Sequence, residues 1–158
     1  MPTPLVVNQE TYEYPVNRDP AGWGGEATGW AQAVTTVLGS LAGPNDILNT
    51  VANIANGQAT PAVVPGLSFD TALVRGATVN YNVYRVTSAP SAQEVVEQGI
   101  MLLSYLPNAN TWDMVILSSR QSGVTFSISN AGQVMYTSST LTGVNYNGSI
   151  TFRAVGLT

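Results

Sequence analysis

Two glutamates, Glu94 and Glu97, come nearest in type and spacing to a pair of catalytic groups. Residues three apart share one face of a helix, and glycoside hydrolysis needs two carboxylates placed on either side of a sugar bond. The pair adjoins a polar stretch at 91–94 that precedes an apolar segment. We therefore interpret both glutamates as part of a solvated loop, since exposure is the ordinary state of Glu.

The aspartates do not predict a metal site. Asp46, Asp70 and Asp113 lack the regular spacing of a calcium-binding loop. Asp46 follows a Pro-Asn dipeptide and Asp70 follows an aromatic residue, and we interpret both aspartates as turn formers.

Two further motifs suggest a ligand or a modification, but structural roles explain them better. Gly22-x-Gly24-Gly25 has the glycine content of a phosphate loop, yet it follows Pro20 instead of a strand and contains no Lys. We interpret these glycines as a tight turn between an arm and a helix. Asn147-Gly148-Ser149 matches a glycosylation acceptor, but Asn-Gly is also a strong hairpin signal, and we predict a hairpin turn there.

The residue types that are missing exclude most nucleophilic and metal chemistry. The 158-residue chain has no His, Cys or Lys, and its basic residues are Arg18, Arg75, Arg85, Arg120 and Arg153. Ser-His-Asp and Cys-His arrangements, Schiff bases and zinc sites of Cys and His are therefore excluded within one chain. We expect a protein that is not an enzyme and that has no cofactor and no metal.

The composition favours a domain built for lasting contact with other proteins. Charged residues make up 9% of the chain, against about 25% in an ordinary soluble domain. A polar surface of Asn, Gln, Ser and Thr gains little from charge repulsion, which suits permanent contacts. The hydrophobic content of 44% argues against disorder. Without disulfides, we expect stability to come from a buried core and from oligomerisation.

Charge and hydropathy also argue against two classes of partner. The net charge of −4 and the scattered arginines exclude the basic stripe that nucleic-acid binding needs. The longest apolar run, at 100–106, is too short to span a bilayer. The first residues lack the basic region and cleavage site of a signal peptide. We expect neither nucleic acid nor membrane as a partner.

The first part of the chain predicts an arm followed by a helix. Residues 1–20 combine four prolines with apolar side chains, which is typical of extended backbone that docks on a neighbour or forms an edge strand of its own domain. Residues 26–41 carry apolar side chains at helical spacing, and Gly43-Pro44 would end that helix. The spacing is also heptad-like, but it is too short for a coiled coil, and a helix packed on its own β-domain is the simpler interpretation.

From about residue 47 the pattern changes from helical to alternating. Val79, Tyr81 and Val83 share one face of a strand predicted at 76–88. The almost wholly apolar run at 99–106 predicts a strand buried on both faces. A loop with Pro61 and Pro65 is expected upstream. Further strands are predicted at 50–56, 112–118, 124–129, 133–139 and 149–155.

These elements predict a mainly β protein in two parts. Seven or so short strands separated by turns indicate an antiparallel β-sandwich or jelly-roll-like domain, preceded by an extended arm and one short helix. We assign 1–45 to the arm and helix, which would serve attachment and oligomerisation. We assign 46–158 to the antiparallel β-domain.

Short motifs spread from about Tyr12 to the end of the chain carry a resemblance to a known family. In chain order they lie at 14–18, 22–24, 28–31, 54–58, 66–70 and 81–87, and the most specific are Gly123-Val124-Thr125-Phe126-Ser127-Ile128-Ser129, 132–134 and 136–139. These segments resemble virion structural proteins of tailed bacteriophages, of the capsid-decoration, head-fibre or tail-fibre type, which carry a C-terminal β-sandwich module.

The resemblance implies a structural role in a virion assembled in the host cytoplasm, usually as a homotrimer. The first hypothesis is a capsid-decoration or head-fibre subunit that trimerises and attaches through its N-terminal segment. The alternative is a tail-fibre or collar adaptor, or a receptor-binding tip module. The implied partners are further copies of the chain and virion proteins such as the major capsid or tail and fibre proteins, and a host surface glycan is a further candidate.

Apolar and aromatic side chains in the first segment are the candidate contacts with these partners. They stand on a backbone rich in Pro and Gly that has little regular structure to bury them, and Trp and Tyr are the usual interface anchors. The candidate attachment and oligomer contacts are Tyr12, Tyr14, Trp23, Ala27, Trp30, Val34, Val37 and Leu41. Aromatic residues of the β-domain, Trp112 and several tyrosines, are candidates for core, subunit contact or a sugar-binding surface.

Overall fold

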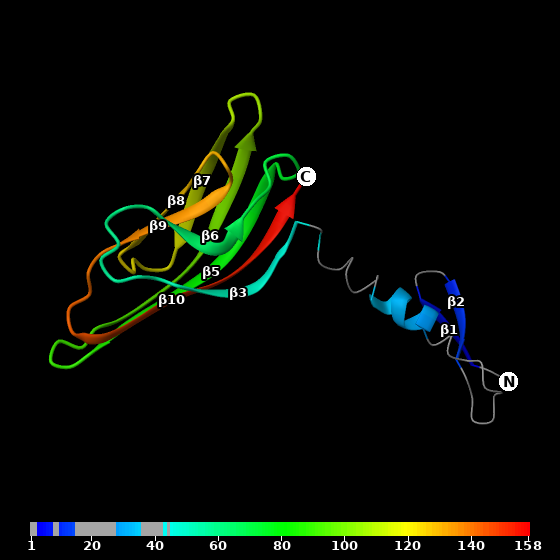
Figure 1. The fold of residues 1–158 in the computed structure, drawn as a ribbon, viewed down its shortest axis with the longest axis horizontal. Coiled ribbons are helices and arrows are strands. Elements are labelled where there is room, and N and C mark those ends of the chain that lie inside the picture. The colour runs from blue at the N-terminus through cyan, green and yellow to red at the C-terminus, as the bar shows by residue number, and fades with distance from the viewer. Residues whose placement is uncertain (1–2, 8–9, 15–27, 36–42, 44) are drawn as a thin grey trace. The chain divides into compact units, whose positions relative to one another are not determined.

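The protein divides into two compact units, Met1–Pro44 and Asn45–Thr158. The structure is a computed structural model, and it describes residues 3–7, 10–14, 28–35, 43 and 45–158. Figure 1 shows the elements of each unit in chain order.

The first unit contains a β-hairpin and a helix. Strands β1 (Thr3–Val7) and β2 (Glu10–Tyr14) pair antiparallel, with Thr3 opposite Tyr14. The extended backbone predicted for the arm is confirmed in these strands. Among the described strands, β1 and β2 form a two-stranded sheet of their own, in which each strand has one paired and one unpaired edge. The described helix spans 28–35, within the predicted 26–41.

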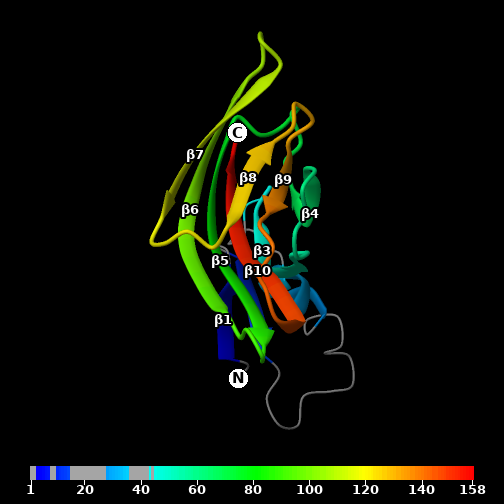
Figure 2. The same ribbon diagram turned by 90° about the vertical axis from the view of Figure 1, so that its left-hand side faces the viewer.

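The second unit is an antiparallel β-sandwich, as predicted. Its strands are β3 (Ile47–Asn53), β4 (Ala62–Ser68), β5 (Gly76–Ser88), β6 (Glu94–Leu106), β7 (Thr111–Ser118), β8 (Val124–Ile128), β9 (Gln133–Ser138) and β10 (Val144–Leu157). One sheet has the order β3-β10-β5-β6-β7, and the other has the order β4-β9-β8. Figure 2 shows β5, β6 and β10 as long curved strands side by side, with β8, β9 and β4 in the second layer.

The core lies between the two sheets and follows from the alternation of the strands. The inward residues of β5 that the pattern predicted, Val79, Tyr81 and Val83, are all buried. The shared face predicted for the last strand is buried too, and it consists of Ile150, Phe152 and Ala154. The smaller sheet supplies Val64, Leu67, Phe126, Val134 and Tyr136 to the same core.

The predicted loop with Pro61 and Pro65 is partly wrong, because Pro65 lies within β4. Proline cannot donate to a sheet ladder, so strands tolerate it at edges and bulges. Here β4 is an edge strand, and its pairing with β9 is interrupted between Val63 and Ser68. Both conditions hold at Pro65, which explains why the strand persists.

Two other expectations are corrected in β6 and β10. The segment at 99–106 is not buried on both faces, because Ile100 and Leu102 are exposed while Met101 and Leu103 are buried. The hairpin turn predicted at Asn147-Gly148-Ser149 is also wrong, since this motif lies inside β10 and pairs with β5. Asn-Gly favours a turn locally, but the long ladder with β5 overrides that preference.

No helix among the residues that the structure describes is long and apolar enough to cross a membrane.

Candidate functional site

A buried arginine organises one region of the sandwich. Arg85 points inward from β5 and is 0% exposed. Its Nε donates to the Tyr146 hydroxyl at 3.1 Å, and its Nη1 donates to the Ser122 carbonyl at 2.7 Å. Its Nη2 donates to Asn56 Oδ1 at 3.3 Å and to the Ser139 carbonyl. The guanidinium therefore ties β5 and β10 to the β3–β4, β7–β8 and β9–β10 loops.

A buried glutamate lies beside this arginine on the next strand. Glu97 points inward from β6 and is 4% exposed. The Tyr81 hydroxyl donates to its Oε1 at 2.6 Å, and the N–H and hydroxyl of Ser122 donate to its Oε2 at 2.7 and 2.6 Å. Because the Ser122 carbonyl accepts from Arg85, the Ser122 residue joins the carboxylate to the guanidinium. Both buried charges are thus hydrogen-bonded, as burial of a charge requires.

Tyr81 completes the network from β5. Burial of its hydroxyl, together with the hydrogen bond to the Glu97 carboxylate, raises the pKa of Tyr81 far above its usual range. The phenol therefore stays protonated at neutral pH and donates to Glu97.

The two glutamates that resembled a catalytic pair are separated by the sheet. Glu94 is exposed, and the Tyr84 hydroxyl donates to its Oε1 at 3.0 Å. Residues three apart in a strand point to opposite faces, and Glu97 points into the sandwich. The solvated-loop interpretation is wrong, because both residues lie in β6 and Glu97 is buried. Their placement does not put two carboxylates on either side of one bond.

Two of the aspartates have structural roles in the β unit. Asp70 Oδ1 accepts from the Ala72 N–H at 2.8 Å, which confirms a turn former. Asp46 Oδ1 accepts from the Gly156 N–H at 3.0 Å and so fixes the chain to the end of β10. Among the described residues, no group of three or more Asp and Glu side chains could hold a metal ion.

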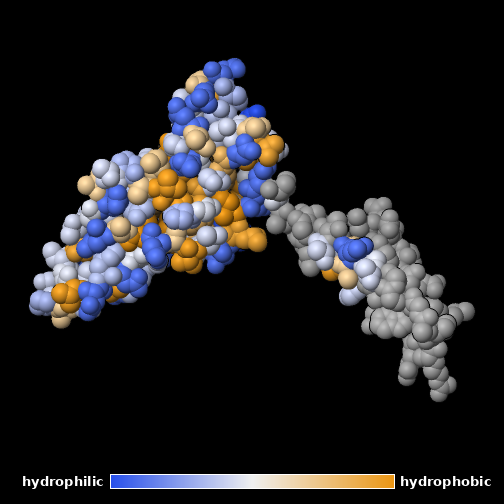
Figure 3. Space-filling model, viewed as in Figure 1, coloured by the Kyte–Doolittle hydropathy of each residue, from blue (hydrophilic) through white to orange (hydrophobic). Residues whose placement is uncertain are grey.

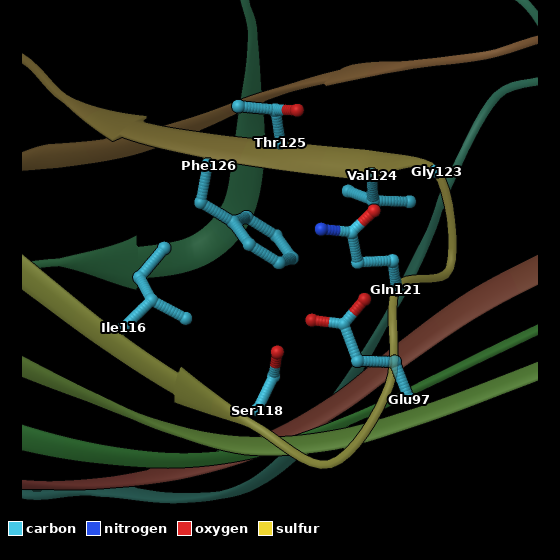
Figure 4. A pocket seen from close by; sticks show the side chains of 8 residues that line it. All are labelled: Glu97, Ile116, Ser118, Gln121, Gly123, Val124, Thr125 and Phe126. Atoms are coloured by element: carbon cyan, nitrogen blue, oxygen red, sulfur yellow. The ribbon is translucent and has the colours of Figure 1, made fainter.

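A pocket of about 300 Å³ opens between the edge strands β7 and β8. It is lined by Glu97, Ile116, Ser118, Gln121, Gly123, Val124, Thr125 and Phe126. Glu97 and Phe126 are buried and form its floor, whereas Ser118 and Gln121 are exposed at its rim. Figure 4 shows the Glu97 carboxylate, the Gln121 amide and the Ser118 hydroxyl directed toward a common space beside the Phe126 ring.

The outer face of the larger sheet carries a group of exposed aliphatic side chains, which we call the β6–β7 patch. It consists of Ile100, Leu102, Val115 and Leu117, which are 38, 44, 56 and 60% exposed. Ile100 lies opposite Leu117 and Leu102 lies opposite Val115, so the four side chains are direct neighbours. Figure 3 shows the other face of the β unit, on which β4 and β9 lie, and hydrophobic residues also reach the surface over the middle of that face.

The candidate contacts of the first segment are placed as follows. Tyr12 and Tyr14 belong to β2. Trp30 and Val34 are half-buried in the helix at 28–35. The remaining four, Trp23, Ala27, Val37 and Leu41, lie outside the residues that the structure describes.

The aromatic residues of the β unit do not form one sugar-binding surface. Trp112, Tyr81 and Tyr136 are buried core residues. Tyr105 stacks against Trp112, with ring centroids 5.0 Å apart, and Tyr146 lies against the Arg85 guanidinium. These rings stabilise the sandwich, as aromatic residues in strands usually do.

The sequence did contain a signal for the buried network, and that signal was missed. Arg85 has the same parity as Val79, Tyr81 and Val83, so the alternation that predicted their burial also predicts an inward arginine. Glu97 likewise shares parity with Met101 and Leu103. The predicted strand began at residue 99, however, so the inward direction of Glu97 is evident only when the strand is extended back to Glu94. The loop partners Asn56, Ser122 and Ser139 have no such signal.

Comparisons with known proteins find little. No protein-family model and no curated protein matches the chain. Among solved structures, the chain is similar to the tailspike protein of Acinetobacter phage vB_ApiP_P1, with a TM-score of 0.43 and 12% identity. The match covers 69% of this chain and 22% of the tailspike chain, so this chain spans about a fifth of that protein. A match of this size and identity carries no argument about function.

Proposed function

We propose that this chain is a non-enzymatic structural protein of a phage virion. It is a capsid-decoration or head-fibre subunit that forms a homotrimer and attaches to the particle through its N-terminal segment. The sequence motifs between 12 and 158 that resemble tailed-phage virion proteins support the virion as its location.

The hydrogen bonds that the buried Arg85 and Glu97 make within the fold support a role without catalysis. A catalytic acid or base must reach a substrate atom within hydrogen-bond distance. Arg85 instead holds three loops, and Glu97 accepts from Tyr81 and Ser122. Glu97 does face the pocket, but it is the sole ionisable group among the residues that line it. A pair of groups that could divide acid and base roles is therefore missing at this site.

The β6–β7 patch is the observation that carries the proposal. The largest contiguous apolar patch on a typical monomer covers about 300–600 Å² and is often a contact site. Fully burying a Val or Leu side chain contributes roughly 1.5–3 kcal/mol. Covering the exposed halves of four such side chains therefore contributes on the order of a few kcal/mol per subunit. The patch, on a chain with 9% charged residues, fits contact with further copies.

Quantitative mass spectrometry of purified particles from a phage that encodes the chain tests this function. We expect the protein in intact particles, at a copy number on the scale of the shell subunits, and we expect its loss when residues 1–44 are deleted. A few copies would favour a tail or collar position instead. Absence of the folded, expressed protein from the particles would overturn the proposal.

A further inference from the structure

We infer that the pocket between β7 and β8 binds one unit of a neutral saccharide. This site is independent of the assembly proposed above, since it lies within one β unit and needs neither a second copy nor a particle.

The floor of the pocket offers a fixed acceptor for a ligand hydroxyl. A carboxylate has about four acceptor sites. Oε2 of Glu97 accepts two hydrogen bonds from Ser122, and Oε1 accepts one from Tyr81. One site on Oε1 therefore remains for a ligand, and the network holds the carboxylate in place without help from the ligand. Such preorganisation lowers the entropic cost of binding.

The charge around the pocket favours a neutral ligand. The Glu97 carboxylate repels anions. The Arg85 guanidinium lies one residue away, because Ser122 donates to Glu97 and accepts from Arg85 at 2.7 Å in each case. The positive charge offsets the negative one, so a cation gains less here than it would beside an isolated carboxylate.

The other lining groups select a ligand with both donors and acceptors. The Gln121 amide can donate and accept, and the Ser118 hydroxyl, which donates to Tyr81, can still accept. Figure 4 shows both directed toward the same space as the Glu97 carboxylate. An ammonium ion has donors but no acceptor, so it gains nothing from the Gln121 NH₂ group, which is exposed and stays hydrated. A sugar hydroxyl serves both functions.

The walls and size of the pocket match a single sugar ring. Ile116, Val124 and Phe126 line it with apolar surface, against which the C–H groups of a sugar ring can pack. Its volume of about 300 Å³ lies at the lower end of ligand pockets and holds roughly ten water molecules at their share of liquid volume. A unit of a longer glycan could enter, because the rim residues Ser118 and Gln121 are exposed.

Amide chemical shifts of the isotope-labelled full chain test the site. The probes are D-glucose, D-galactose, D-mannose, L-rhamnose, L-fucose and N-acetyl-D-glucosamine, each titrated alone, with ethylammonium chloride as the cationic probe. We expect at least one sugar to bind with millimolar affinity and to shift amides within 116–126. We expect ethylammonium to leave these amides unchanged.

Two glutamine variants provide the matched comparison. Gln121→Ala removes an exposed rim group and should weaken sugar binding at least tenfold while its spectrum remains that of the folded protein. Gln133→Ala removes an exposed glutamine at the start of β9, outside the pocket, and should leave the affinity unchanged. The inference is overturned if no sugar shifts these amides, if ethylammonium alone does, or if Gln121→Ala binds as tightly as the parent chain.

Discussion

At the scale of single residues, Arg85 links separate loops of the sandwich, as a disulfide or a metal ion does in other small domains. Among the residues that the structure describes, it has no direct carboxylate partner, and its guanidinium donates mainly to groups on three separate loops. Arg suits this position because its donors form a rigid planar fork and its charge is weakly hydrated. The loops are held by a side chain that has the same inward parity as the core.

Replacing Arg85 should therefore be costly although it leaves the apolar core intact. Arg85→Met removes the donor to the carbonyls of Ser122 and Ser139. It also removes the positive charge that Ser122 links to the buried Glu97 carboxylate. We expect a loss of about 3 kcal/mol or more in the free energy of unfolding, measured by chemical denaturation. Arg153→Met is the control, because Arg153 is exposed on β10, and it should change stability by less than about 0.5 kcal/mol. Equal effects would show that the network is not needed for the fold.

Tyr81 makes the stability of the fold depend on alkaline pH. Its pKa is raised in the folded state by burial and by Glu97, whereas the unfolded chain loses this proton near pH ~10. The contribution is therefore fully present below pH ~10 and declines as the pH rises above it. Tyr81→Phe should cost roughly 1.5–3 kcal/mol at neutral pH, since it removes a buried bond to a charged group. The difference between the two proteins should shrink in more alkaline buffers.

Chemical denaturation of the parent chain and of Tyr81→Phe, from neutral to alkaline pH, measures how the difference in their free energies of unfolding shrinks. Tyr84→Phe serves as a comparison, since it removes a hydroxyl from the other face of the same strand. If the free energy of unfolding of Tyr81→Phe differs from that of the parent chain by the same amount at all pH values, the role assigned to Tyr81 is contradicted.

At the scale of elements, alternation predicted most strands but not their limits. The inward faces of β5 and β10 were evident from Val79, Tyr81, Val83, Ile150 and Phe152, because side-chain parity is a local property. The strand at Pro65 and the extension of β10 through Asn147-Gly148 were missed, because they depend on partners far away in sequence. The pocket was also missed: seven of its eight lining residues lie between Ile116 and Phe126, but Glu97 at its floor comes from β6 and was interpreted as part of a loop.

Gly148 shows how long-range packing overrides a turn signal. An added Cβ there would lie 2.0 Å from the Tyr146 hydroxyl and 2.7 Å from the Ile54 carbonyl. We expect Gly148→Ala to destabilise the protein by about 1–3 kcal/mol, because backbone must shift to admit the methyl group. In Gly76→Ala the nearest atom is the Leu103 carbonyl at 3.3 Å, so a smaller shift suffices, and the loss in the free energy of unfolding should be smaller than in Gly148→Ala. A larger loss at Gly76 than at Gly148 would contradict this account.

At the scale of the whole molecule, the β unit should fold without the first unit. All residues of the core cluster lie between Ile47 and Ala154. A chain that starts at Asn45 keeps Asp46, whose carboxylate accepts from the Gly156 N–H. We expect this chain to retain its β signature by circular dichroism and a single cooperative unfolding transition. Loss of cooperativity would mean that residues 1–44 belong to the same folding unit.

The assignment to a self-assembling structural protein rests on the β6–β7 patch, and the solution mass of the full chain tests it most directly. We expect the parent chain at micromolar concentration to have three times the chain mass. The double variant Leu102→Gln, Leu117→Gln should keep its circular dichroism spectrum but have the mass of one chain, because polar groups in the patch would be desolvated without partners. A parent chain that is monomeric, or a double variant that remains trimeric, would contradict the account.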